Sequence, residues 1–242
     1  MQFAAISDAG RVRENNEDSY CLGELRAPLL PAGRQPMLMA VADGLGGLSA
    51  GEVASTLAIR ILQDQLSDLD GDPVGRLRAA ILAAHAAILR CSGAGAQDMA
   101  TTMTATIVSG CDLWWGHVGD SRAYLARGGG LIALTHDHSV TGELLAAGRI
   151  GREAARLHPR RHVLTQALGI GDEPLVETGT ARLQAGDWLI LATDGLTAVL
   201  RDEEIAQAVG TSDGPGACCK ELVALANARG GPDNVTVIAA RA

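Results

Sequence analysis

The sequence is poor in several features that mark common classes of protein. Aromatic residues make up only 2% of its 242 residues, so the core must be built from Ala, Leu, Val and Ile. The formal net charge is −8 and no Lys/Arg run of useful length occurs, which disfavours direct nucleic-acid binding. No uninterrupted apolar stretch approaches the ~18 residues of a membrane span, so no membrane segment is expected.

The five cysteines and six histidines indicate neither a disulfide framework nor a zinc site. The cysteine number is odd, and neither residue type shows metal-site spacing. The adjacent Cys218 and Cys219 lie in an alanine-rich helical stretch and are expected to be reduced packing residues. The first ten residues lack the basic and apolar regions of a signal peptide. We therefore expect a cytoplasmic protein, and a monomer.

The balance of 47% hydrophobic and 20% charged residues is that of a globular chain. No internal repeat or low-complexity linker divides it, so residues 1–242 are predicted to form one domain. Helices are expected to begin near residues 51, 73, 202 and 215, and residues 138–159 are weakly helical. Strands are expected at 3–6, 37–42, 102–108, 113–118, 122–126, 131–134, 187–193 and 234–239. Helix pairs alternating with strand runs predict an α+β fold with helices outside a sheet sandwich.

Two segments of nearly the same sequence, LMAVADG and LILATDG, end at Asp43-Gly44 and at Asp194-Gly195. Each apolar run is typical of a buried strand, so both aspartates are placed at the edge of a hydrophobic core. A carboxylate there is costly unless positive charge lies beside it. Asp-Gly is also a common turn signal, and two tight turns are the plainer interpretation of either segment alone.

Three more aspartates share this setting and favour a functional interpretation. Asp18 in ENNEDS, Asp120 in HVGDSRAYL and Asp233 in GGPDNVTV each lie beside Gly, Asn or Ser, next to an apolar segment. Carboxylates, water and backbone carbonyls are the ligands that Mg²⁺ and Mn²⁺ prefer. Two such ions lower the pKa of a bridging water and direct it at phosphorus. The five carboxylates therefore predict one metal site suited to hydrolysis of phosphate monoesters.

Arg13 is the candidate for holding a substrate phosphate. It lies five residues before Asp18 in the loop GRVRENNED. An arginine can grip phosphate oxygens in bidentate fashion, whereas a lysine acts as a point charge. A solvated loop arginine is the alternative, and the proximity to Asp18 favours the phosphate-binding role.

Other polar residues near these motifs are expected to be structural. His117 lies on an apolar strand and is predicted to be a hydrogen-bonded core histidine. Thr101 and Thr102 are expected to face alternately across a strand, with no catalytic role. Asn234 is expected to hold the Asp233 loop through side-chain to backbone hydrogen bonds.

Eight motifs, in order and over nearly the whole chain, resemble the metal-dependent Ser/Thr protein phosphatases, the type 2C (PPM) family, in its bacterial single-domain branch. The motifs are SDAGRVRENNEDS, VADGLGGLSAGEVAS, MATTMTATIV, GHVGDSRAYL, LTHDHS, VLTQALG, LATDGLT and GGPDNVTV. The resemblance implies a four-layer α-β-β-α sandwich, in which helix pairs flank a central antiparallel β-sandwich. This agrees with the layers inferred above.

The resemblance also implies the ligands of two metal ions. Asp43 and the backbone carbonyl of Gly44 match the ligands of the first ion. Asp194 and Asp233 match those of the second, and Asp43 bridges the pair. Asp43 and Asp194 are therefore expected to be catalytic as well as metal-binding.

Further roles are implied around this pair. Asp18 is expected to act through metal-bound water, and Asp120 to hold a third, weaker ion with Asp194 shared. Arg13 matches the arginine that docks the substrate phosphate, and residues 139–172 match a mobile flap that shapes protein-substrate choice. Animal members carry a histidine, a proposed general acid, where this chain has Leu45, so the identity of the general acid stays open.

The implied reaction is hydrolysis of phosphoserine and phosphothreonine on proteins, with Mn²⁺ or Mg²⁺, by a metal-bridging water or hydroxide. The implied partners are phosphorylated proteins and an opposing bacterial Ser/Thr kinase. One alternative is a catalytically silent phosphoprotein-binding module of the same fold, which a missing metal aspartate would favour; none is missing. Another is a small-molecule phosphatase or nuclease, which the ordered motifs and the acidic charge balance disfavour.

Overall fold

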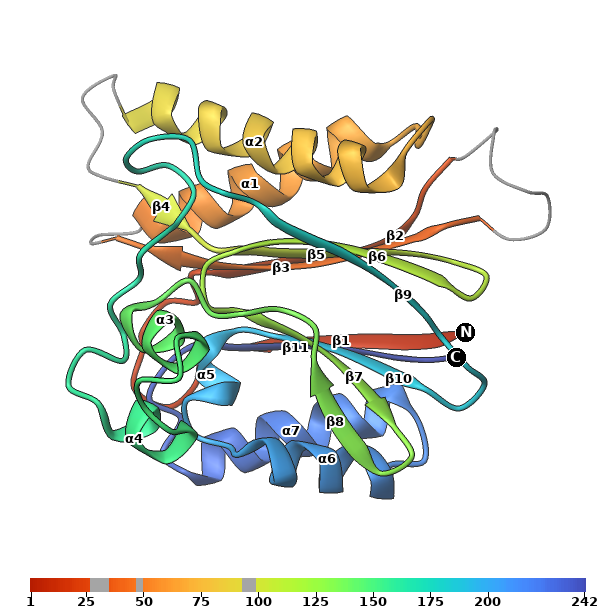
Figure 1. Ribbon diagram of the computed structural model, residues 1–242, viewed down its shortest axis with the longest axis vertical. Helices are drawn as coiled ribbons and strands as arrows, with labels where there is room; N and C mark the ends of the chain where they lie inside the picture. Colours follow the sequence, from red (N-terminus) through yellow and green to blue (C-terminus); the bar gives the residue numbers. More distant parts are fainter. Residues whose placement is uncertain (27–34, 47–49, 93–98) are drawn as a thin grey trace.

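The computed structural model describes residues 1–26, 35–46, 50–92 and 99–242. Two antiparallel sheets pack face to face, and a pair of helices covers the outer surface of each (Figure 1). The four-layer α-β-β-α sandwich expected from the sequence is confirmed. Apolar side chains must be shielded on both faces of each sheet, which explains why the helices lie outside.

Chain order and sheet order differ, because the chain crosses between the sheets several times. The first sheet runs in the order β1 (Gln2–Asp8), β11 (Val235–Arg241), β10 (Trp188–Ala192), β7 (Arg122–Arg127), β8 (Gly130–Ala133). The second runs β2 (Asp18–Glu24), β3 (Met37–Leu45), β5 (Met103–Ser109), β6 (Asp112–Val118), β9 (Glu177–Arg182). A short strand, β4 (Ala100–Thr101), pairs with the end of β3.

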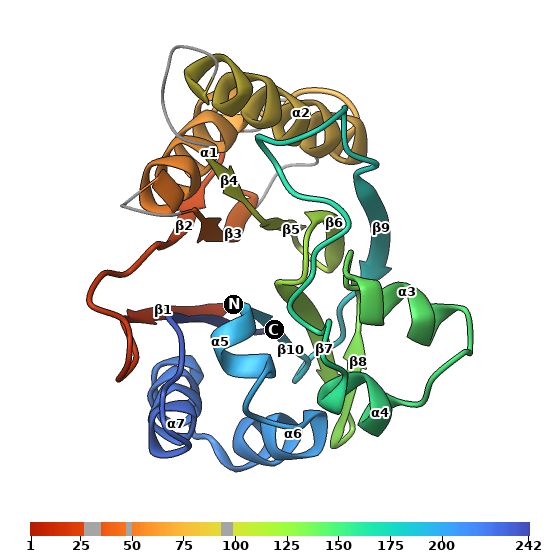
Figure 2. The same cartoon turned by 90° about the vertical axis from the view of Figure 1, so that its left-hand side faces the viewer.

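The helices of the described residues fall into two long pairs and three short ones. α1 (Ala50–Leu66) and α2 (Pro73–Ser92) cover the second sheet, and α6 (Asp202–Thr211) and α7 (Pro215–Ala228) cover the first (Figures 1 and 2). The short helices are α3 (Val140–Ala146), α4 (Arg152–Leu157) and α5 (Asp194–Thr197). Within the described residues, no helix has both the length and the apolar character needed to cross a membrane.

The core consists of three apolar layers, one between the sheets and one beneath each helix pair. The layer between the sheets is mainly aliphatic and includes Met39, Val41, Leu113, Leu191 and Ile238. The expectation that small aliphatic residues replace aromatics in this core is confirmed.

The sequence patterns missed three strands, β2, β9 and the two-residue β4. β2 and β9 are edge strands whose outer sides are partly exposed, so their sequences, DSYCLGE and ETGTAR, lack a continuous apolar run. The loop that contains Arg13 therefore ends at Asp18, where β2 begins. The expected weakly helical segment contains α3 and α4.

The interpretation of both Asp-Gly pairs as tight turns is wrong. β3 continues through Asp43 and Gly44 to Leu45, because β2 pairs with Asp43 and β4 pairs with Gly44 and Leu45. Asp194 is instead the first residue of α5, which follows β10 almost directly.

Truncation of Leu191 should test the packing between the sheets. This side chain is 0% exposed, so Leu191→Ala should lower the free energy of unfolding by about 2–5 kcal/mol through lost burial and a residual cavity. Leu175, which is 69% exposed, gives the matched control, with an expected change within about 0.5 kcal/mol. Urea unfolding measures both, and equal effects would contradict the assignment of Leu191 to the core.

Candidate active site

Five aspartates gather at one end of the sandwich, the end that faces the viewer in Figure 2 with α5 near the centre. Asp18 opens β2, Asp43 lies near the end of β3, Asp120 lies between β6 and β7, Asp194 opens α5, and Asp233 precedes β11. Burial raises the pKa of Asp43, and the charges of the other four aspartates raise it further. The structure thus brings together all five carboxylates that the sequence predicted as ligands.

Two of these carboxylates face each other across adjacent strands. Asp18 and Asp43 are direct partners in the antiparallel register of β2 and β3. Like charges in such a pair destabilise a sheet. Burial raises the pKa of Asp18 to about 7, although hydrogen bonds from Thr236 and Thr193 act in the opposite direction. Placing the carboxylates of Asp18 and Asp43 opposite each other therefore does not stabilise the fold.

The carboxylate of Asp18 is held on one side only. Its Oδ2 accepts hydrogen bonds from Thr193 Oγ1 at 2.8 Å and from Thr236 Oγ1 at 2.7 Å. Its Oδ1 is buried and has no hydrogen-bond partner among the described residues. A buried polar oxygen without a partner is costly, and a cation or an ordered water would remove that cost.

The donor set fits divalent cations of the hard type. Burial is the leading cause of the raised pKa of Asp120 and of Asp194, and neighbouring aspartates add to it in both cases. Clustered carboxylate oxygens with raised pKa values and an unpartnered Asp18 Oδ1 are suited to Mg²⁺ or Mn²⁺. The individual assignment of each residue as a ligand stays a prediction.

The backbone of Asp43 is fixed by two threonines that the sequence analysis set aside as structural. Asp43 N donates to Thr102 Oγ1 at 3.0 Å, and Thr101 Oγ1 donates to Asp43 O at 2.8 Å. Thr102 Oγ1 also lies 2.8 Å from Ser121 Oγ, beside Asp120. These buried hydroxyls connect the positions of two predicted ligands. The signal in the sequence was the run of threonines in an otherwise apolar strand.

Both glycines of the Asp-Gly pairs are required by close backbone approach. A Cβ on Gly44 would overlap the carbonyl oxygens of Gly51 and Glu17. A Cβ on Gly195 would overlap the carbonyl oxygen of Asn234. Glycine at these positions therefore lets neighbouring segments pack directly against the chain that carries the aspartates.

Arg13 lies at the exposed rim of the cluster. Its Nη2 donates to Asp233 Oδ2 at 2.8 Å, and the side chain is 53% exposed. The hydrogen bond to Asp233 is the main cause of the raised pKa of Arg13. Because a guanidinium has five N–H donors, this contact leaves others free for an oxyanion. The structure thus pairs the predicted phosphate-binding residue with a predicted metal ligand.

Asn234 joins the arginine loop to the loop that carries Asp233. Its Oδ1 accepts from Glu17 N at 2.8 Å, and its Nδ2 donates to Asn15 O at 2.8 Å. Asn234 N in turn donates to Asp233 Oδ1 at 2.9 Å. The expected side-chain to backbone bonds of Asn234 are confirmed, and they also hold the segment between Arg13 and Asp18.

A second group of metal-type side chains, His117, His138 and Glu177, has ligand atoms within 4.8 Å of one another. His117 Nδ1 lies 2.8 Å from Thr104 Oγ1, and its Nε2 lies 3.1 Å from the carbonyl oxygen of His136. Both ring nitrogens are therefore engaged within the protein. Burial lowers the pKa of His117 to about 4. The prediction of a hydrogen-bonded core histidine is confirmed.

The predicted flap, residues 139–172, contains α3 and α4 and lies beside α5 (Figure 2). Arg152 Nη1 donates to Asp202 Oδ2 at 2.6 Å. Arg156 Nη1 donates to the carbonyl oxygens of Thr197 and Leu200. Arginines of this segment therefore anchor it to the residues that follow Asp194.

Comparison with known proteins agrees with this geometry. The profile of the protein phosphatase 2C family matches residues 30–213. The chain belongs to this family. The bacterial branch of the type 2C phosphatases, expected from the ordered motifs, is confirmed by the relatives that follow.

The similar proteins include two bacterial phosphatases of different length. The Ser/Thr protein phosphatase PstP of Mycobacterium tuberculosis is 39% identical over 244 residues, which cover 99% of this chain and 45% of PstP. The chain thus spans about half the length of that relative. The protein phosphatase PhpP of Streptococcus pneumoniae is 36% identical, with 98% of this chain and 96% of PhpP covered.

A solved structure of the PstP catalytic domain, in complex with two manganese ions, is similar throughout. It is 36% identical, has a TM-score of 0.84, and the match covers 99% of this chain and 97% of that one. The manganese ions belong to that protein. That a similar protein binds manganese agrees with the oxygen donor set of the five aspartates described above.

Neutralising Asp43 should separate the stability of the fold from its capacity to bind metal. In EDTA, Asp43→Asn should raise the free energy of unfolding by on the order of 1 kcal/mol, because it removes repulsion from a cluster of carboxylates. A folded-state pKa that is raised, as for Asp18, means that ionisation destabilises the fold as pH rises through about 7. Measurement at pH 8 should therefore give the largest effect.

In saturating Mn²⁺ the order should reverse. The wild-type chain should gain about 2.7 kcal/mol at a metal concentration one hundred times Kd, and the variant should gain less. Urea unfolding with and without metal measures this, with Asp64→Asn on the exposed face of α1 as control. An Asp43→Asn variant that responds to Mn²⁺ like the wild type would contradict a role for Asp43 as ligand.

Proposed function

We propose that this chain hydrolyses phosphoserine and phosphothreonine monoesters of proteins in a Mn²⁺- or Mg²⁺-dependent reaction. The observation that carries the proposal is the cluster of aspartates in which Asp18 keeps one buried oxygen without a partner. Such a cluster is unfavourable for folding alone and suited to divalent cations. The names of the relatives, Ser/Thr protein phosphatase PstP and protein phosphatase PhpP, support the substrate class.

The proposed ligands of two ions are Asp43, the carbonyl of Gly44, Asp194 and Asp233, with Asp43 bridging. When bound, these ions supply positive charge for the phosphate oxygens and a water of lowered pKa for in-line attack. Asp43 is presented by a strand that β4 extends, and Asp194 by the first turn of α5. Carboxylates on such rigid elements need little reorganisation to act together.

Three further residues complete the proposed site. Asp18 acts through an ordered water, which can donate a hydrogen bond to the unpartnered Oδ1. Asp120 holds a third ion, and Asp194 is shared between this ion and the pair. Arg13 orients the substrate phosphate with the guanidinium donors that its bond to Asp233 leaves free. Leu45 cannot donate a proton, so protonation of the leaving alkoxide falls to a group other than the side chain that follows Asp43-Gly44.

We also propose that residues 1–242 act as one catalytic unit, with residues 139–172 as a flap that contacts protein substrates. An opposing bacterial Ser/Thr kinase, a monomeric state and a cytoplasmic location complete the proposal. A silent phosphoprotein-binding module is the weaker candidate. A module that only binds phosphoproteins would not require five clustered aspartates, because their mutual repulsion destabilises the fold.

Metal removal and Asp194→Asn should test the reaction directly. Phosphate release from a phosphothreonine peptide should require Mn²⁺ or Mg²⁺ and be abolished by EDTA. Replacing a residue that only supports a metal ligand typically costs about 10–100-fold in activity. Asp194→Asn removes a proposed ligand itself, so it should lower kcat by more than that. The surface variant Asp64→Asn should retain activity. Turnover in EDTA would refute metal dependence, and metal binding without turnover would support the silent module.

Replacement of Arg13 should separate substrate binding from chemistry. Arg13→Ala should raise KM for the phosphopeptide by roughly tenfold, and Arg13→Lys should have a smaller effect, since lysine keeps the charge without the planar fork. Steady-state kinetics at saturating Mn²⁺ measure both parameters, with Arg60→Ala on α1 as control. An unchanged KM in Arg13→Ala would exclude the phosphate-docking role.

A further inference from the structure

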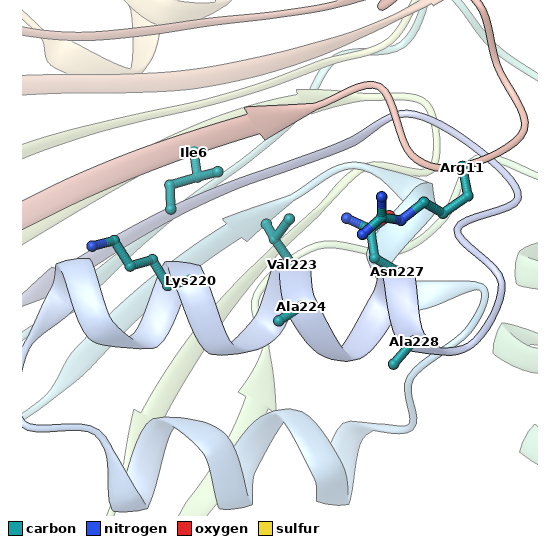
Figure 3. Close-up of a pocket in the computed structure, with 7 residues that line it drawn as sticks. All are labelled: Ile6, Arg11, Lys220, Val223, Ala224, Asn227 and Ala228. Carbon is teal, nitrogen blue, oxygen red and sulfur yellow. The ribbon is translucent and has the colours of Figure 1, made fainter.

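A groove separate from the aspartate cluster lies between β1 and α7. It has a volume of about 400 Å³. Figure 3 shows Ile6, Val223 and Ala224 along its floor, with Lys220 and Arg11 standing at opposite ends. An apolar floor between two cations suits an extended peptide segment that carries acidic side chains.

The two cations are not used by the fold. Among the residues that the structure describes, no carboxylate lies within 4.0 Å of the charged atoms of Arg11 or of Lys220. Lys220 is also the sole lysine in the sequence, on a chain with net charge −8. Unpaired positive charge on an acidic protein favours a negatively charged partner at this groove.

The arginine end of the groove is held in place by its surroundings. Arg11 N donates to Gly231 O at 2.8 Å, which fixes the loop against the turn after α7. Asp8 Oδ1, at the end of β1, already receives hydrogen bonds from Gly10 N at 2.9 Å and from Asn227 Nδ2 at 3.1 Å. A rigid loop loses less conformational freedom when a ligand binds.

One end of the groove is close in sequence to the proposed active site. Arg11 is two residues from Arg13, the residue proposed to hold the substrate phosphate. From Lys220 to Asn227, which lies beside Arg11 in Figure 3, α7 rises about 10 Å at 1.5 Å per residue. An extended peptide covers about the same length in three residues.

We infer that this groove binds an acidic segment of the phosphoprotein substrate, with two carboxylates about three residues apart that meet Arg11 and Lys220. The inference rests on the proposed function and adds a determinant of substrate choice to it. The apolar floor receives the side chain between the two acids. Specificity here comes from residues of the substrate that do not react.

The experiment compares phosphothreonine peptides that carry two glutamates three residues apart with the same peptides carrying glutamines. The pair is placed at successive distances on either side of the phosphothreonine, so that the register need not be assumed. For the best register, kcat/KM should be roughly threefold to tenfold higher with glutamates, mainly through KM, and the preference should shrink in high salt.

Charge reversal at the groove should invert this preference. Arg11→Glu and Lys220→Glu should each favour the glutamine peptide, while Arg60→Glu, the same change on α1 of the opposite layer, should keep the wild-type ratio. Because each ratio is taken within one variant, a general loss of activity cancels. A wild-type ratio near one in every register, or an unchanged ratio in Lys220→Glu, would overturn the inference.

Fluorescence anisotropy of labelled peptides in EDTA measures peptide binding to the groove in the absence of phosphate hydrolysis. Weaker binding of the glutamate peptide to Lys220→Glu than to the wild type supports the groove even where turnover fails. Equal binding of glutamate and glutamine peptides to the wild type overturns it even where phosphate release proceeds. Failure of the proposed function is seen instead as absent turnover of every peptide with Mn²⁺.

Discussion

Repulsion among carboxylates at one end of the sandwich is the constraint on which the rest of the structure depends. Asp18 and Asp43 face each other in the sheet register, and Asp194 and Asp233 add their charges to the same space. Arg13 pairs with Asp233 at the rim, whereas no cationic side chain of the described residues lies within 4.0 Å of the carboxylate of Asp18 or Asp43. Threonine hydroxyls bond to Asp18 and to the backbone of Asp43, and Gly44 lets other segments pack closely. Stability gained in the apolar layers offsets this local cost.

Carboxylates elsewhere show how the same fold treats a structural acid. Asp137 receives two hydrogen bonds of 2.7 Å from Arg122, and Asp187 receives a hydrogen bond of 2.6 Å from Arg127. Both of these acids therefore have a guanidinium partner. The bond from Arg127 is the main cause of the lowered pKa of Asp187. Asp18 and Asp43 have raised pKa values instead. This contrast within one molecule separates acids that stabilise the fold from acids that the fold reserves for another charge.

Much of this arrangement could be predicted from the sequence, because the strongest patterns are local. The apolar runs before Asp43 and Asp194 identified buried strands, and the ordered motifs indicated the layers. Patterns failed where the environment is set by distant segments. β2 and β9 are edge strands with little apolar periodicity, and the Asp43-Gly44 pair lies in a strand because β2 pairs with Asp43 and β4 pairs with Gly44. The threonines at 101 and 102 support Asp43 through contacts that no spacing rule could indicate.

The crossing of the chain between the two sheets has a consequence for how the protein is made. Asp18 in one sheet bonds to Thr236 in the other, and β11, which carries Thr236, pairs with β1 at the opposite end of the sequence. Contacts of such sequence separation form late in folding, because a long loop must close first. During synthesis, the nascent chain can pair β2 with β3, and so bring Asp18 to Asp43, before Asp194 and Asp233 have been made. The full set of five aspartates therefore comes together only after residues 233–241 leave the ribosome, and a partly made chain carries an incomplete site.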